Sequence, residues 1–159
     1  MELSNSDKTV VLLNLLDFQL NEIQRREQKE QQWFEWTSSL LLATFGVIVA
    51  LASRSSGSLS YAVIIKSLAT VLIAVPALLI ILRIRDQSKG SITNAKAVER
   101  LQELLLLFED GPYGVQSPYP HEWKNKLAHS RLKRKTPIYY ILILLLMTAC
   151  VITTVWLVL

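Results

Sequence analysis

The sequence predicts an all-α membrane protein with three transmembrane helices and two or three cytoplasmic helices. Of its 159 residues, 51% are hydrophobic, and the mean hydropathy of +0.32 is high for a small soluble domain. All 13 acidic residues lie in residues 1–35 or 86–122, which leaves long stretches with almost no charge. Lysine and arginine are unevenly divided among the segments that connect these stretches, as is typical of membrane proteins.

The apolar stretches place the three spans at residues 33 or 37 to 53, 59–82 and 137–159. Each is close to the ~20 residues that a helix needs to cross ~30 Å of hydrocarbon. The remaining segments are expected in the cytoplasm. The predicted parts are therefore an amphipathic helix running into the membrane at 1–36, a transmembrane hairpin at 37–82, a helical segment with a basic juxtamembrane run at 83–136, and the third transmembrane helix at 137–159.

The basic residues predict the orientation of the spans. Four lie in residues 1–36, one in the turn at 54–58, ten in 84–136 and none after Lys135. Because cytoplasmic loops carry an excess of Lys and Arg, the N-terminus is expected in the cytoplasm and the C-terminus outside. The predicted location is the plasma membrane, in particular the bacterial inner membrane, in a multi-pass arrangement.

The first cytoplasmic helix is expected to begin near Lys8 and to continue into span one, because residues 7–46 contain no Pro and only one Gly, at position 46. Its second part, residues 24–32, is polar and is expected to be solvated. Its first part carries an apolar stripe on one face, formed by Val10, Leu13, Leu16, Leu20 and Ile23.

The second cytoplasmic helix is expected at about 93–110, separated from span two by Gly90 and stopped by Gly111 and Pro112. Apolar residues recur along it at spacings of three and four. The two cytoplasmic helices can bury their stripes on each other within one subunit or between subunits.

Two features of the spans bear on assembly. Span two contains Lys66, which can extend to the headgroups as an anchor or line a pore. Small side chains follow one face of span one and recur in span two, which permits close packing either within the hairpin or between copies of the chain, so a homo-oligomer is expected. These candidate packing residues are Ser39, Ala43, Gly46 and Ala50, with Thr70.

The segment before the third span is strongly basic: residues 121–135 hold six Lys or Arg and one acid, Glu122. Three interpretations remain open, namely contact with anionic lipid headgroups, binding of an anionic ligand such as a nucleotide or RNA with aromatic stacking, and docking of a protein. The candidate contact residues are Trp123, Lys124, Lys126, Arg131, Lys133, Arg134 and Lys135.

Motifs for catalysis are missing from the sequence, so no catalytic, cofactor or metal residues are predicted and an enzyme is not expected. His121 and His129 have no nearby cysteines or paired carboxylates, which argues against a zinc site. Neither a glycine-rich phosphate loop nor a serine nucleophile elbow occurs. Cys150 is the single cysteine and is interpreted as a packing residue.

The order of parts resembles small prokaryotic membrane effectors of the SLATT type, which accompany nucleotide-signalling and CRISPR-linked antiviral systems. The corresponding parts are the charged N-terminal helix at 7–32, the hairpin at 37–82 and the helix at 96–110. The third span lies outside this pattern. The resemblance implies oligomerisation into a membrane-perturbing pore, triggered by a cytoplasmic protein or messenger.

Two functions are therefore expected to compete. In the first, the chain is a small oligomeric effector or channel that perturbs the membrane in response to a cytoplasmic signal, in which a nucleotide messenger is favoured over nucleic acid as the partner. In the second, it is a non-conducting anchor or scaffold subunit for a soluble enzyme. Replacing Lys66 should change conductance in a pore and do little in an anchor.

Overall fold

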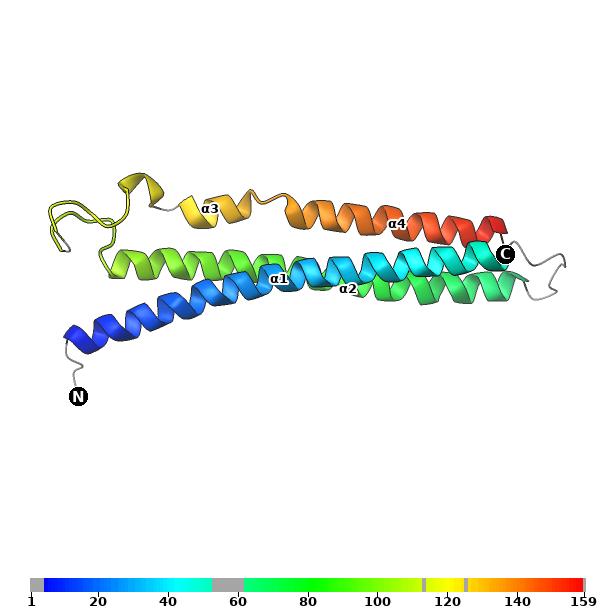
Figure 1. Cartoon of the computed structure of the whole chain (residues 1–159), viewed down its shortest axis with the longest axis horizontal. Helices are drawn as coiled ribbons and strands as arrows, with labels where there is room; N and C mark the ends of the chain where they lie inside the picture. Colours follow the sequence, from blue (N-terminus) through cyan, green and yellow to red (C-terminus); the bar gives the residue numbers. More distant parts are fainter. Residues whose placement is uncertain (1–4, 53–61, 113, 125, 159) are drawn as a thin grey trace. The chain divides into compact units, whose positions relative to one another are not determined.

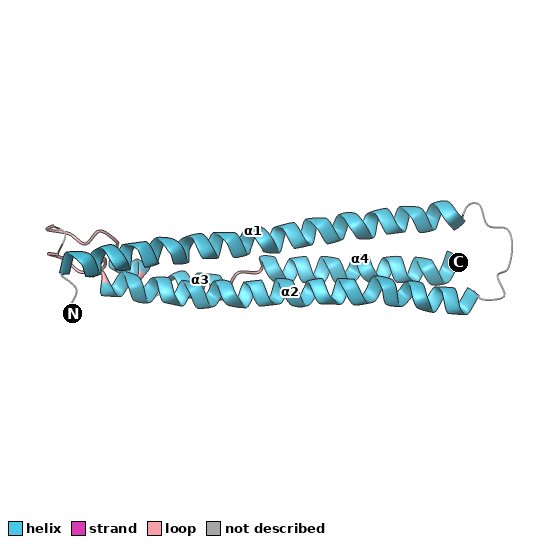
Figure 2. Ribbon diagram, turned by 90° about the horizontal axis from the view of Figure 1, so that it is seen from below, coloured by secondary structure: helices cyan, strands magenta, loops and turns pink. Residues whose placement is uncertain are grey.

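The computed structural model describes residues 5–52, 62–112, 114–124 and 126–158 (Figure 1). Its elements are α1 (Asn5–Ala52), α2 (Ala62–Leu104), the 3₁₀ helix η1 (His121–Trp123), α3 (Lys126–Leu132) and α4 (Thr136–Val158). The described residues contain no strand, only an isolated bridge between Gly111 and Gly114 (Figure 2). Three helical segments are long and apolar enough to cross a membrane, which confirms the predicted all-α fold with three candidate transmembrane helices. The predicted outer turn at 54–58 lies outside the described residues.

The chain forms two compact units. Unit 1 comprises residues 1–28 and 87–134, and unit 2 comprises residues 29–86 and 135–159. Helices α1 and α2 each contribute residues to both units, because each continues without a break past the residue at which the units divide. The prediction of one helix from the N-terminal region into span one is thereby confirmed.

Helix α1 buries only part of the predicted stripe. Val10, Leu13 and Leu20 are exposed, whereas Leu16 and Ile23 are buried. A spacing of seven residues is typical of long helices that pack along their length, since it matches 3.5 residues per turn. The expectation that residues 24–32 are solvated is wrong at Glu30, which is fully buried. Buried positions on α1 recur seven residues apart at Leu16, Ile23, Glu30 and Thr37.

Helix α2 passes through Gly90 instead of ending there. A glycine inside a helix costs only about 1 kcal/mol relative to alanine, so it does not by itself end the helix. At this position the absence of a side chain also has a use, because a Cβ on Gly90 would overlap the guanidinium of Arg26. That guanidinium lies within hydrogen-bonding distance of the side-chain oxygen of Gln87, at 3.4 Å.

The end of α2 lies six residues before the predicted one, at Leu104. Leu106 has a positive φ of 54°, and the backbone N–H groups of Leu106 and Leu107 donate to the carbonyls of Glu103 and Gln102. This pair of bonds is a Schellman cap, which satisfies two of the last carbonyls of the helix. Glycine is the usual residue at the position of Leu106, so this end of the helix could not be predicted from the sequence.

The core of unit 1 joins α1, α2 and α3 through apolar side chains. Val98 of α2 is fully buried at its centre. Leu127 and Ala128 of α3 pack against this cluster, so the short α3 helix is part of the unit. Its buried members are Leu16, Ile23, Ala95, Val98 and Leu105.

The core of unit 2 is apolar and draws on all three long helices. The ring of Phe34 stacks on that of Tyr140, with centroids 4.3 Å apart, which joins α1 to α4. Thr37 and Thr148 are also buried, and each donates to a carbonyl one turn earlier in its own helix. The buried cluster comprises Leu41, Ile48, Ile80, Ile84, Leu144, Val151 and Val155.

Candidate functional site

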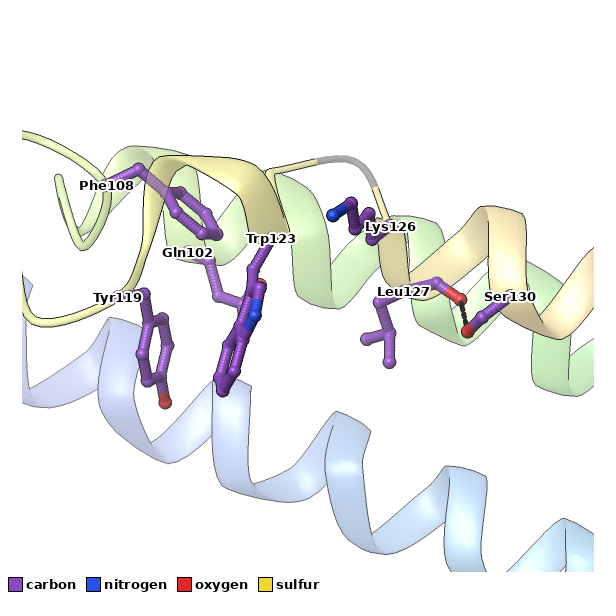
Figure 3. A pocket seen from close by; sticks show the side chains of 7 residues that line it. All are labelled: Gln102, Phe108, Tyr119, Trp123, Lys126, Leu127 and Ser130. Atoms are coloured by element: carbon purple, nitrogen blue, oxygen red, sulfur yellow. Dashed lines mark hydrogen bonds between the residues drawn. The ribbon is translucent and has the colours of Figure 1, made fainter.

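The most developed site lies in unit 1, where side chains from α2, η1, α3 and the segment between α2 and η1 line a pocket of about 410 Å³ (Figure 3). Aromatic rings form most of its apolar wall, and a lysine, an amide and a hydroxyl supply polar groups. In Figure 3 the side chains of Tyr119 and Trp123 extend in the same direction from the chain. The lining residues are Gln102, Phe108, Tyr119, Trp123, Lys126, Leu127 and Ser130.

The aromatic wall is held by the turn that follows α2. Phe108 is buried, and the backbone N–H of Tyr119 donates to the carbonyl of Leu107 at 3.0 Å, which returns the chain to the end of α2. The ring centroids of Phe108 and Tyr119 are 5.9 Å apart, and those of Tyr119 and Trp123 are 6.0 Å apart. Such distances are typical of mutually stabilising aromatic pairs. Trp123 nevertheless keeps 59% of its surface exposed, so its ring is available to a ligand.

The opposite wall is α3, which α2 holds by its first turn. The side-chain oxygen of Glu99 accepts a bond of 2.8 Å from the backbone N–H of Ala128. The first N–H groups of a helix have no partner within that helix, so a carboxylate there is stabilising. Ser130 donates its hydroxyl to the carbonyl of Leu127 at 2.8 Å, as the dashed line in Figure 3 shows, and its oxygen can still accept a bond.

Acidic residues accompany the cations around the pocket. Lys124 lies 3.7 Å from Glu103, and Lys126 lies 4.0 Å from Glu122. These pairs are exposed and long, so each contributes little to stability and either lysine can turn to a ligand. The pocket therefore offers aromatic stacking together with a movable positive charge, which suits a planar ligand that carries an anionic group.

Contacts of Asp110 fix the loop that enters the pocket. The backbone N–H of Ser117 donates to Asp110 at 2.7 Å, and His121 lies 3.6 Å from the same carboxylate. The bond from Ser117 is the main cause that lowers the pKa of Asp110, and His121 adds to it. Asp110 thus contacts both ends of the segment that positions Tyr119, through the hydrogen bond from Ser117 and the close approach of His121.

The predicted contact residues of the basic run separate into different environments. Trp123 and Lys126 line the pocket, whereas Lys133 and Lys135 are exposed, and contact of these two with lipid stays a prediction. The two arginines are used within unit 1. Arg131 and Arg134 both contact the carboxylate of Glu27 on α1, Arg134 at 2.8 Å.

Burial is the main cause that lowers the pKa of Arg131, and the charge of Arg134 adds to the effect. The guanidinium still remains charged, because the ordinary pKa of arginine lies far above neutral. The three side chains keep only 24–26% of their surface exposed. Glu27 therefore ties the end of α3 to α1, a role that the sequence did not reveal.

The candidate residues of the spans also separate. Lys66 and Thr70 both bond with Trp156 of α4. The small residues of span one do not line the interface within unit 2. Instead they are exposed, and a Cβ on Gly46 would meet no atom within 4 Å. These exposed residues are Ser39, Ala43, Gly46 and Ala50.

The sequence predicts Trp123 and Lys126 as contact residues, but it does not predict Gln102, Phe108 and Ser130 as partners in the same pocket. Phe108 is one of the apolar residues expected at 93–110, and its ring packs against that of Tyr119. The available signal was the group of aromatic residues on both sides of the turn-rich segment at 111–120.

Comparisons of the chain with models of protein families, with curated proteins and with solved structures found no match. A helical bundle serves many unrelated functions, so the fold alone does not assign one. A function must therefore be inferred from the chemistry of the pocket, of the spans and of the helices that the two units share.

Proposed function

We propose that this protein is a small membrane effector whose cytoplasmic unit 1 binds a signalling ligand or partner and whose unit 2 spans and perturbs the membrane as an oligomer. The observation that carries the proposal is the continuity of α1 and α2, which each contribute to both units. A rigid helix with residues in a ligand-binding unit and in a spanning unit is a suitable element to transmit a change of packing.

The pocket supports a ligand trigger. Ligand pockets of 300–1,000 Å³ with apolar walls and a few polar groups are typical of small-molecule sites, and this pocket of about 410 Å³ has that composition. Aromatic stacking beside Lys126 favours a planar anionic ligand, of which a nucleotide is the most familiar kind. The SLATT-type resemblance extends the proposal to antiviral defence.

The apolar interior of unit 2 supports assembly of several copies. Its described core is filled with apolar side chains, so a water-filled path within a single chain has no support. A path would have to form between copies. The exposed small residues around Gly46 supply a face on which helices of two copies can approach closely.

The proposed location is the bacterial inner membrane, with unit 1 in the cytoplasm and the C-terminus outside. The support is the excess of Lys and Arg in residues 1–36 and 84–136. Lys133 and Lys135 are exposed directly before α4, where they can contact anionic headgroups.

The first test is the mass of the purified protein in mild detergent, measured by light scattering with correction for bound detergent. A defined oligomer larger than a dimer is expected. The same protein in vesicles of phosphatidylethanolamine and phosphatidylglycerol should release a trapped dye when AMP, GMP or cyclic di-AMP is added. Trp123→Ala should abolish the response, whereas Leu132→Ala, a change at an exposed residue of unit 1 outside the pocket, should not. A dimer that leaves the vesicles sealed would contradict the proposal.

A second function is a non-conducting scaffold that holds unit 1 beside a soluble protein. The observation that favours it is the outer face of α1 in unit 1, where large apolar side chains remain exposed at Val11, Leu15 and Phe18. Such a stripe at a spacing of three and four is suited to a groove on a partner. Pull-down with Phe18→Ala as the comparison separates the two functions, because loss of a bound protein with no change in dye release favours the scaffold.

A further inference from the structure

Lys66 is the one charged residue in residues 59–82, so its side chain lies in an otherwise uncharged part of α2. An ammonium in a span needs a polar partner, because hydrocarbon supplies none. In unit 2 this partner is internal. The Nζ of Lys66 donates to the backbone carbonyl of Trp156 on α4 at 3.2 Å.

Two more hydrogen bonds close a ring between the same helices. The indole Nε1 of Trp156 donates to the hydroxyl oxygen of Thr70 at 3.1 Å. That hydroxyl in turn donates to the carbonyl of Lys66 at 2.8 Å. Each of the three residues both donates and accepts, so the polar groups of this cluster satisfy one another.

The bond from Lys66 is charge-assisted, because its donor is an ammonium. Such bonds are stronger than those between two neutral groups. The acceptor is a backbone carbonyl in the last described turn of α4, so this bond joins the charge of α2 directly to the main chain of α4.

We propose that Lys66 is a structural residue and not a permeation charge: with Thr70 and Trp156 it forms a clasp that fixes the last described turn of α4 on α2. Apolar side chains between spans permit rotation and sliding, since lipid tails are as apolar as the side chains they replace. Hydrogen bonds are directional, so the clasp sets the rotation of α4 about its axis. Loss of these hydrogen bonds would therefore allow this end of α4 to rotate or slide on α2.

Hydrogen exchange of the full-length protein in lipid nanodiscs, followed by mass spectrometry, tests the clasp. Lys66→Met keeps the length of the side chain and removes its charge, and should raise the exchange rate of the peptide that covers the last turn of α4 about tenfold. Thr70→Val and Trp156→Phe each remove the bond between indole and hydroxyl, and should raise it about threefold. Lys66→Arg retains a donor and a charge and should stay close to the unsubstituted protein.

Ser67→Ala is the matched control, since Ser67 is an exposed neighbour of Lys66 on the same helix. Its exchange should be unchanged. Thr70→Val keeps the lysine, so it reports on the clasp even if Lys66→Met does not insert into the membrane. The proposal is overturned if Thr70→Val and every inserted Lys66 variant exchange within twofold of the unsubstituted protein, or if Ser67→Ala has the same effect. A change in conductance of Lys66→Met without faster exchange would also overturn it.

Discussion

Units 1 and 2 share two helices, but different interactions stabilise the interior of each unit. In unit 1, charged side chains add to the apolar core: Glu27 contacts two arginines, and Glu99 accepts a hydrogen bond from the first turn of α3. In unit 2 the described contacts are an apolar core, an aromatic stack and the Lys66 clasp. One helix can therefore be stabilised by different interactions in different parts of its length.

Water accounts for this difference. In the proposed topology unit 1 lies in water. Burial of apolar surface away from water stabilises it, and its exposed ion pairs remain hydrated. Helices in hydrocarbon are not stabilised in this way when they associate, so packing and hydrogen bonds must stabilise the bundle.

The sharpest pair of substitutions is Val98→Ala in unit 1 and Val155→Ala in unit 2, because both side chains are fully buried. Val98→Ala should cost ~2.5 kcal/mol, the sum of transfer from water and a cavity contribution. Val155→Ala should cost only ~1 kcal/mol, the cavity contribution alone. Hydrogen exchange of the peptides around each site measures both. Equal costs would mean that unit 2 opens into water and is not in a membrane.

Glu27→Gln should destabilise the end of α3 by ~2 kcal/mol, since it leaves two largely buried guanidinium groups without their shared carboxylate. The expected result is faster hydrogen exchange in residues 126–134. Asp17→Asn is the control, because Asp17 is an exposed acid of the same helix. If both changes leave exchange unaltered, charge pairing does not hold unit 1 together.

Leu106→Gly should stabilise unit 1 by ~1 kcal/mol. Leu106 has a φ of 54°, which costs an L-residue about this much and costs glycine almost nothing. Thermal unfolding followed by circular dichroism measures the change. Leu104→Gly, on the same turn but inside the helix, should have the opposite sign.

The smallest effect concerns pH and the loop that enters the pocket. The pKa of Asp110 is lowered in the folded state, so its contribution is present at neutral pH and is lost as the pH falls through the lowered value. Below pH ~4, the ordinary range of aspartate, residues 109–119 should begin to exchange faster. Asp110→Asn should exchange fast already at neutral pH and lose this dependence. A pH dependence that persists in the variant would assign the effect to another acid.

Much of the architecture was readable from the sequence. Neither Gly nor Pro interrupts residues 7–45, and α1 is accordingly a single helix. The three apolar stretches are helical and long enough to span. Their orientation and their assembly into a pore stay predictions.

The errors arose where the local sequence was misleading or carried no signal. Glycine disfavours a helix, but α2 continues through Gly90 beside Arg26. The turn at Leu106 could not be predicted, because glycine is the usual residue at such a position and is absent there.

The candidate site was only partly predictable for the same reason. The aromatic and basic residues of the pocket were visible in the sequence, but Gln102 and Ser130 join it only when α2 and α3 pack. Likewise, Arg131 and Arg134 belong to a basic run by sequence, yet their partner Glu27 is more than 100 residues away, at 107 for Arg134.

The proposed topology places unit 2 across a membrane and unit 1 in the cytoplasm. Labelling of single thiols with a membrane-impermeant maleimide tests both assignments. In a Cys150→Ser background, Gln116→Cys should react only after the cells are opened, because Gln116 is an exposed residue of unit 1. Leu145→Cys should stay unreactive until the membrane is dissolved, although Leu145 is 51% exposed on α4. Reaction of Gln116→Cys in intact cells would contradict the orientation. Equal reaction at both sites in opened cells would contradict the membrane assignment of unit 2.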